Sequence, residues 1–422
     1  MDDTISKEKF IRDAKRIFKQ NTFKGYSKWK KKHYKFIAPS DREYTFQWLW
    51  DTAFHAIVLS HFDTEWAKNE ILNFLKGQWS DGFLPHIIFW GNKKRLPHWA
   101  YIESGLSIRP KTTSITQPPI LPIAVECIYS KDNDKEFLVN TVEKLANHHK
   151  WLLFNRDNDK DYLISIISPN ESGMDELPVF QIAAGYKGLD TPRLHFTYRK
   201  GDFQNHRYRF NSKKILEKDY FNVEELLFNT IFIESARCIS RLYKVLGNDK
   251  ESKEFLRIAD KSEKALLTKC WDKKEKIFYS LYSNKEKSAK VKTVASLIPI
   301  FLDGLKDKQL EDLIANHLIN EKEFWTPYPF PSVAKNEIYY QPEDTPLYKV
   351  KLLWRGPTWI STNWLIVKGL RKHGYHSLAN SVIKRMVEMT EKHGFREYYN
   401  PETGQGYRRR NFGWSTLIID LL

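Results

Sequence analysis

The amino-acid sequence predicts an all-α protein in which six helical hairpins close into one (α/α)6 barrel. Apolar residues recur at helical spacing along most of the 422 residues, and this period predicts about twelve helices. The segment 222–246 is apolar on nearly every face, which is typical of a helix buried on all sides, whereas 250–271 carries a single apolar stripe. An inner helix followed by an outer helix is the alternation expected of a double-walled helical toroid.

The predicted helices follow one another in pairs along the chain. They lie near residues 5–20, 48–60, 63–77, 119–130, 133–155, 222–246, 250–271, 292–302, 307–319, 357–372, 375–393 and 413–421. Three stretches between them lack a helical period and are too long for ordinary connections, so we expect them to form lids or walls of a cleft. These lid-like insertions lie near 80–118, 156–221 and 320–356. Within the second, Leu194-His-Phe-Thr-Tyr198 alternates aromatic and β-branched residues and predicts a short strand.

The chain is predicted to be a single domain over residues 1–422, because no stretch has the Gly/Ser-rich or Pro-rich composition of a linker. Its 41% hydrophobic and 28% charged residues are typical of a soluble globular protein. The N-terminus has no apolar signal region, and no segment approaches the roughly 18 apolar residues of a membrane span. Three cysteines without a Cys-x-x-Cys pair indicate a reducing compartment, so we expect a cytoplasmic protein with no membrane partner.

Lysine and arginine exceed aspartate and glutamate by 16, an excess that could indicate nucleic acid, an anionic surface or an acidic substrate. The strongest local cluster is Lys28-Trp-Lys-Lys-Lys-His-Tyr-Lys35, in which basic and aromatic residues are interspersed. No nucleic-acid-binding motif accompanies it, so we expect a solvated segment and no nucleic-acid partner. Arg408-Arg409-Arg410 instead lies close in sequence to Glu397, where an anionic substrate group could bind.

Two acidic residues, Asp175 and Glu397, lie in short, sharply turned segments near aromatic residues. Hydrolysis of a glycosidic bond needs such a pair, because one protonated carboxyl releases the leaving oxygen and one ionised carboxylate activates water or attacks the sugar. Aromatic residues make up 14% of the chain, including 14 tryptophans. Sugar-binding clefts use such rings, because the apolar faces of pyranoses pack on Trp and Tyr, although core packing also explains many of them.

The residues around each acid support both a catalytic and a structural interpretation. Gly173 permits a tight turn before Asp175, and two apolar neighbours could desolvate this carboxyl and raise its pKa, as a general acid requires. Asp175 could equally cap a turn, with its acidic neighbours solvated. Glu397 lies next to an arginine and two tyrosines that could stabilise its anion, or it could form a surface ion pair with Arg396.

Four motifs in this order resemble those of glycoside hydrolase family 63. They are Tyr44-Thr-Phe-Gln-Trp-Leu-Trp-Asp-Thr-Ala-Phe54, Glu171-Ser-Gly-Met-Asp175, Trp354-Arg-Gly-Pro-Thr-Trp359 with Asn363-Trp364, and Glu397-Tyr-Tyr399. That family includes processing α-glucosidases and microbial mannosylglycerate and glucosylglycerate hydrolases, and it shares its clan with the trehalases. Because the chain begins almost directly at the predicted barrel, it resembles the short microbial members more than the processing glucosidases with their β-rich N-terminal domain.

The resemblance implies the same barrel and hydrolysis with inversion, which requires no cofactor. Asp175 matches the family's general acid and Glu397 its general base. The positions that match contacts to the sugar or the walls of its pocket are Tyr44, Trp48, Trp50, Asp51, His86, Gln117, Trp354, Arg355 and Trp359. These positions also have structural alternatives. The tryptophans could line a core helix, Arg355 could clamp a carbonyl, Gln117 could bind the backbone, and His86 could be a core histidine.

We therefore expect an inverting, exo-acting α-glycosidase that releases glucose or mannose from a small glycoside resembling mannosylglycerate or glucosylglycerate. A trehalase-like or oligosaccharide α-glucosidase and a non-catalytic sugar-binding toroid are the alternatives. No metal site is expected, because the sequence has no His-Glu-x-x-His motif, no phosphate loop and no cluster of Cys and His.

Basic residues in the predicted rim loops bear on the leaving group. Arg193, Arg199 and the run Arg408-Arg409-Arg410 could bind a carboxylate such as that of glycerate, or they could simply solubilise the rim. The residues leave open which sugar and which aglycone are bound, whether Glu176 contacts the substrate, and the oligomeric state.

Overall fold

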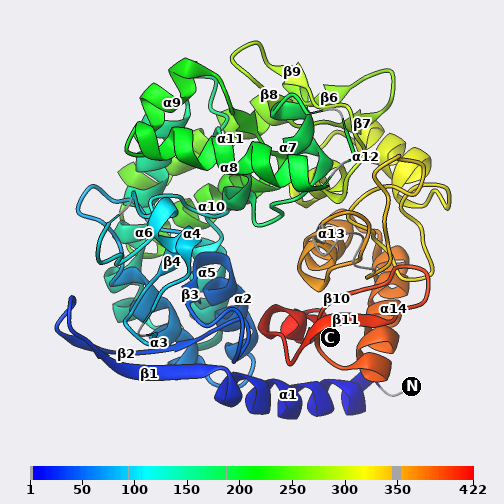
Figure 1. Cartoon of the computed structure of the whole chain (residues 1–422). Helices are drawn as coiled ribbons and strands as arrows, with labels where there is room; N and C mark the ends of the chain where they lie inside the picture. The colour runs from blue at the N-terminus through cyan, green and yellow to red at the C-terminus, as the bar shows by residue number, and fades with distance from the viewer. Residues whose placement is uncertain (1–2, 94, 106, 187, 190, 345–352) are drawn as a thin grey trace.

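The computed structural model describes residues 3–93, 95–105, 107–186, 188–189, 191–344 and 353–422. These residues form a helical toroid with a few small sheets (Figure 1). The inner wall consists of α2 (Leu49–Leu59), α5 (Leu121–Asp132), α10 (Leu226–Val245), η2 (Val294–Phe301), α13 (Ile360–Lys372) and η5 (Gly413–Asp420). Each inner segment contacts the next in this order, and η5 contacts α2, so the ring is closed.

An outer layer of helices packs on the inner ring. Its members are α1 (Asp3–Gln20) on η5, α3 (Thr64–Leu75) on α2, α6 (Lys135–Arg156) on α5, α11 (Asp249–Lys269) on α10, and α14 (His376–His393) on α13. The buried residues of α11 recur at helical spacing, as one inward-facing stripe requires, whereas α10 is buried along almost its whole length. The predicted alternation of inner and outer helices is therefore confirmed for this pair.

All twelve predicted helices have a counterpart in the structure, although their geometry is not uniform. The inner segments η2 and η5 are 3-10 helices, and Pro299 inside η2 lacks the N–H that an α-helical bond needs. The segment predicted near 307–319 consists of α12 (Asp307–Leu313) followed by one π-helical turn, η3 (Ile314–Leu318). No helix in the described part of the chain is both long and apolar enough to cross a bilayer.

The prediction that 156–221 lacks helices is wrong. This stretch contains η1 (Pro169–Ser172), α7 (Pro178–Ala183), α8 (Thr191–Arg207) and α9 (Ser212–Lys218). The strand predicted at 194–198 lies within α8, whose buried positions Leu194 and Asn205 mix apolar and polar side chains and so produce no apolar stripe. The stretch 80–118 contains α4 (His98–Glu103) and β4 (Ile87–Ile88), and part of 320–356 lies outside the described residues.

Short antiparallel strands cover the toroid. They are β1 (Thr22–Ser27) with β2 (Lys32–Ile37), β3 (Gln47–Trp48) with β4, β6 (Trp271–Asp272) with β7 (Ile277–Phe278), β10 (Arg396–Tyr399) with β11 (Gly406–Arg410), and β5 (Val223–Glu224) with β8 (Leu281–Tyr282) and β9 (Lys287–Ser288). Thr358, just before α13, pairs with both Pro331 and Tyr399. These pairings hold the loops before the inner helices together at one rim.

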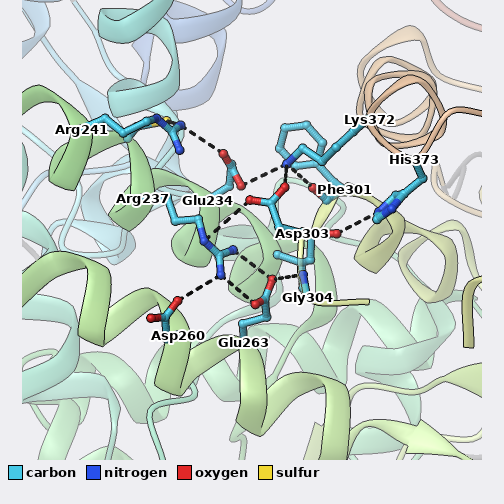
Figure 2. A network of polar contacts seen from close by, with 12 residues as sticks. Glu234, Arg237, Arg241, Asp260, Glu263, Phe301, Asp303, Gly304, Lys372 and His373 are labelled. Carbon is cyan, nitrogen blue, oxygen red and sulfur yellow. Dashed lines mark hydrogen bonds and ion pairs between the residues drawn. The ribbon is translucent and has the colours of Figure 1, made fainter. Parts of the chain in front are cut away.

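At the C-terminal ends of α10 and α13, charged side chains form a network (Figure 2). Arg237 donates to both oxygens of Glu263 at 2.9 and 2.7 Å, and Lys372 lies 2.9 Å from Asp303 and 3.3 Å from Glu234. Because these groups come from α10, α11, α13 and the segment after η2, the network ties neighbouring elements of the toroid together.

Candidate active site

Asp175 lies in a loop that is anchored immediately before it. Glu171 is fully buried, and its two oxygens accept hydrogen bonds from Arg156 at 2.6 and 2.7 Å and from two backbone N–H groups. Gly173 has φ +71°, and a Cβ there would lie 2.6 Å from the ring of Trp50. The loop therefore needs glycine at this position, and Glu171 is a structural anchor, not a solvated residue.

The carboxyl of Asp175 faces a cavity of about 320 Å³, which is also lined by Tyr44, Trp48 and His86. Burial raises the pKa of Asp175 to about 6. Four residues that the resemblance assigned to one site, from three separate parts of the chain, thus line one cavity. A carboxyl with a raised pKa beside a cavity is suited to donate a proton near neutral pH.

Glu397 is buried at a β-bulge between β10 and β11. Its Oε1 accepts a hydrogen bond from the hydroxyl of Tyr44 at 2.9 Å and lies 3.5 Å from Nη1 of Arg408, whereas its Oε2 has no hydrogen-bond partner. Arg408 has φ +54°. Bulges of this kind turn a side chain out of the regular alternation of a strand, and here the bulge brings Glu397 to Tyr44.

The electrostatic environment of Glu397 differs from that of Asp175. Burial raises the pKa of Glu397 to about 7, while the positive charge of Arg408 and the hydrogen bond from Tyr44 act to lower it. A hydroxyl that donates to Oε2 would lower this pKa further, because hydrogen bonds to the charged form favour it. The contacts with Arg408 and Tyr44 favour the ionised form of Glu397, but burial outweighs them, so its pKa stays above that of an ordinary glutamate. Arg396 donates to backbone carbonyls, so the expected stabilising arginine is Arg408.

Several buried polar atoms near these acids lack a partner within the protein. Asp51, in the first turn of α2, has a free Oδ1, and burial raises its pKa to about 8, with a smaller contribution from the charge of Glu397. Both ring nitrogens of His86 and Nε1 of Trp48 are also without partners, and burial lowers the pKa of His86 to about 3. Buried polar groups are normally satisfied. A ligand rich in hydroxyl groups would supply the missing partners.

The late aromatic motif forms a compact stack. The rings of Trp354 and Trp359 are parallel, with centroids 3.8 Å apart, and Trp359 also contacts Tyr398 at 4.7 Å. Arg355 is buried, and its Nη2 donates to Gln181 at 3.0 Å while its Nε has no partner. Among the described residues, no backbone carbonyl accepts from Arg355, so the clamp on a carbonyl is not found there.

Two predicted site residues support the wall of the site. The side chain of Trp50 is buried, with its ring 5.3 Å from Phe54 and 5.4 Å from Trp414. The side-chain oxygen of Gln117 accepts from the backbone N–H of Trp50 at 3.2 Å and so fixes the start of α2. Neither residue lines the 320 Å³ cavity, and their contact with substrate stays a prediction.

The rim contains acidic residues that the sequence did not reveal. Glu103 of α4 and Asp202 of α8 line the cavity together with the motif residues. Burial raises the pKa of Glu103 to about 8. Glu176 also lines it and accepts from the backbone N–H of Leu353. Periodicity could not place Glu103 or Asp202, because both lie on lid helices that were not predicted.

The rim arginines have different environments. Arg199 lines the cavity. Arg408 lies 3.5 Å from Glu397 and 3.7 Å from Glu43, whereas Arg409 is paired with Glu43. These contacts place Arg199 and Arg408 near the two acids.

Comparisons with known proteins agree with this geometry. A family model described as the mannosylglycerate hydrolase MGH1-like glycoside hydrolase domain matches residues 44–415. The chain is 30% identical to a mannosylglycerate hydrolase of Thermus thermophilus, over 91% of this chain and 95% of that protein. It is 23% identical to a glucosylglycerate hydrolase of Mycolicibacterium hassiacum, over 89% and 91%.

A solved structure extends the comparison to three dimensions. The crystal structure of a GH63 mannosylglycerate hydrolase from Thermus thermophilus in complex with Tris and D-glycerate superposes with a TM-score of 0.84. The two chains are 27% identical, and the match covers 98% of this chain and 99% of that one. The likeness therefore extends over essentially the whole toroid.

Proposed function

Since the chain belongs to the mannosylglycerate hydrolase MGH1-like glycoside hydrolases, we propose that it is an inverting, exo-acting α-glycosidase that releases mannose or glucose from a small glycoside. Glycosidase activity on small glycosides follows from membership in the family. The inverting mechanism, the residues that perform it and the identity of the substrate are the content of the proposal.

In this mechanism Asp175 is the general acid. Its proton passes to the glycosidic oxygen as the bond between that oxygen and the anomeric carbon breaks. Glu397 is the general base, and its unpartnered Oε2 takes a proton from a water molecule that attacks the opposite face of the anomeric carbon. Room for this water requires the two carboxyl groups to stand roughly 6.5–9.5 Å apart. No cofactor takes part in these steps.

The observation that carries the proposal is the environment of Glu397. A carboxylate that is 2% exposed, held at Oε1 by Tyr44 and Arg408, with Oε2 unpartnered, has the features of a base. A sugar-binding protein without catalytic activity would have no need for a carboxylate held in this way. The free polar atoms of Trp48, Asp51 and His86 would bind the hydroxyls of the sugar that is released.

The architecture fits a small substrate. We interpret the toroid as an (α/α)6 barrel that forms one catalytic domain over residues 1–422, with 80–118, 156–221 and 320–356 as cleft walls. A cavity of about 320 Å³ lies at the lower end of the range for small-ligand sites, which favours a disaccharide-sized glycoside over a long oligosaccharide. Three free cysteines, two of them buried, fit the expected cytoplasmic location.

For the leaving group, we propose a glycerate-like anion. Two of the similar proteins are named as a mannosylglycerate hydrolase and a glucosylglycerate hydrolase, and Arg199 lines the cavity near Asp175. A guanidinium can bind a carboxylate through two parallel hydrogen bonds. Trehalose and short α-glucosides are the competing substrates.

The test is hydrolysis of mannosylglycerate, glucosylglycerate, trehalose and the matching glycerol glycosides, with released mannose and glucose measured separately. We expect the highest kcat/KM for a glycerate glycoside, and NMR should detect the β-anomer of the sugar first. Initial release of the α-anomer would refute inversion. Absence of hydrolysis by wild type, or an unchanged rate in Glu397→Gln, would refute the catalytic assignment.

A further inference from the structure

A second cavity, of about 330 Å³, shares no lining residue with the cavity at Asp175. It lies where the β1–β2 hairpin meets the segments that follow α3 and α4. Its cationic side chains are Lys30, Arg109 and Lys111, and no carboxyl group lines it among the described residues. The rest of its lining consists of two tryptophans, Gly77 and small hydroxyl or amide side chains.

Positive charge gathers around this cavity. The pKa of Lys30 is lowered by burial first and then by the charges of Lys32, Lys144 and Lys111, and the pKa of Lys76 is lowered by burial and by Lys32. In the part of the chain that the structure describes, none of these lysines forms an ion pair with a carboxylate. Such unrelieved repulsion between like charges favours the binding of an anion.

The walls of the cavity are held in place by the protein. Nε1 of Trp29 donates to the carbonyl of Phe89 at 3.0 Å, and the ammonium groups of Lys30 and Lys111 lie 5.4 and 5.9 Å from the Trp29 ring centroid. Nε1 of Trp79 donates to the hydroxyl of Thr112 at 2.9 Å. Trp79 is 41% exposed. Two of the three cations therefore lie beside an aromatic ring that a hydrogen bond holds in place.

We propose that this cavity is a binding site for a small molecule with two or more adjacent phosphoryl groups. Lysine and arginine bind phosphoryl oxygens through charge-assisted hydrogen bonds, and several cations around one cavity can engage more than one such group. The hydroxyl and amide groups of the lining, which include Gln78 and Ser107, supply further donors. A cavity of this size suits a small polyanion better than a nucleic-acid duplex. The site does not depend on the glycosidase mechanism.

Isothermal titration calorimetry with pyrophosphate, triphosphate, orthophosphate and sulfate tests the site. We expect pyrophosphate and triphosphate to bind more tightly than orthophosphate and sulfate. Their affinity should fall as the salt concentration rises. The double variant Lys30→Gln/Lys111→Gln should weaken binding at least about tenfold, since each charge-assisted contact contributes on this scale.

The matched control is Lys253→Gln/Lys264→Gln, which removes the same charge from exposed positions of α11. This control should bind like wild type, and thermal melting should show that both variants are folded. Absence of pyrophosphate and triphosphate binding, equal affinity for orthophosphate, or equal loss in both variants would overturn the proposal. So would tighter binding of a DNA duplex than of triphosphate, which would indicate a nucleic-acid surface.

Discussion

Replacing Arg408 by methionine should change the pH dependence of hydrolysis in a defined way. Arg408 lies 3.5 Å from Glu397 and also donates to the hydroxyl of Tyr44 at 3.1 Å. Its positive charge favours the ionised carboxylate and so lowers the pKa of Glu397, which is about 7 in the native protein. Removal of the charge must therefore raise this pKa, and the ionised fraction of the base falls at low pH.

The size of the shift follows from the contact. Two unit charges 3.5 Å apart interact by about 5 kcal/mol at an effective dielectric constant of about 20. Because the Arg408 side chain is 32% exposed, solvent screens the pair, and about 1.4–2.8 kcal/mol is a realistic remainder. This energy corresponds to a rise of roughly one to two pH units in the pKa of Glu397.

The assay is kcat/KM of wild type and Arg408→Met from acidic to alkaline pH, with a glycoside found to be a substrate. Well below both carboxyl pKa values, the variant should be about 10–100-fold slower, because the ionised fraction of Glu397 falls by that factor. Above the new pKa, Glu397 is ionised in both proteins, so the two rates should converge. This pattern holds whichever of the two acids has the higher pKa.

The neighbouring Arg409→Met is a matched control, because it removes the same charge from a residue that pairs with Glu43. Its pH profile should follow wild type closely. If Arg408→Met were slower by the same factor at every pH, Arg408 would act in substrate binding and not on the charge of the base. Equal pH shifts in both variants would show that the pKa of Glu397 responds to the net charge of the protein and not to its contact with Arg408.

Three further outcomes follow from the structure. Asp175→Asn should lower kcat by about 10²–10⁴-fold or more on natural glycosides and much less on a substrate whose leaving group needs no proton, and equal losses on both would remove Asp175 from the role of acid. Gly173→Ala should lower the free energy of unfolding by about 2 kcal/mol in denaturant titrations, because of its positive φ and the clash with Trp50. Gly185→Ala, with φ +72° but open space, is its control and should cost less. Arg237→Met should destabilise by about 3–5 kcal/mol, since it leaves a buried carboxylate without its cation; a loss below about 1 kcal/mol would show that the network in Figure 2 contributes little.

Much of the toroid could be predicted from the sequence, because inner and outer helices differ in the width of their apolar faces. Apolar periodicity did not predict α8, whose side chains Tyr198, Arg199 and Asp202 line the cavity. A helix that presents polar groups to a cleft has no apolar stripe to detect. The lid elements were therefore hidden by the same feature that makes them part of the site.

The sequence singles out Asp175 and Glu397 as candidate acids, but it does not reveal the groups that contact Glu397. Tyr44 and Glu397 are 353 positions apart and are joined by a hydrogen bond, and no local pattern indicates such a contact. Arg396 is adjacent in sequence to Glu397, yet the contact is made by Arg408, because the bulge changes the pairing of β10 and β11. Sequence adjacency is a poor guide to electrostatic partners wherever a strand is irregular.

Function and stability place opposite demands on polar groups in this fold. At the candidate site, Asp51, His86 and Glu397 each keep at least one buried polar atom without a partner among the described residues, and every such atom costs free energy. Elsewhere, buried charges are paired, as in Arg156 with Glu171 directly behind the acid loop. That ion pair fixes the loop that carries Asp175, and Glu171 also accepts from the backbone N–H of Thr116. The next residue, Gln117, accepts from the backbone N–H of Trp50 and so fixes the start of α2, next to Asp51. Paired and hydrogen-bonded groups behind the site thus hold two of the elements that carry its acidic residues.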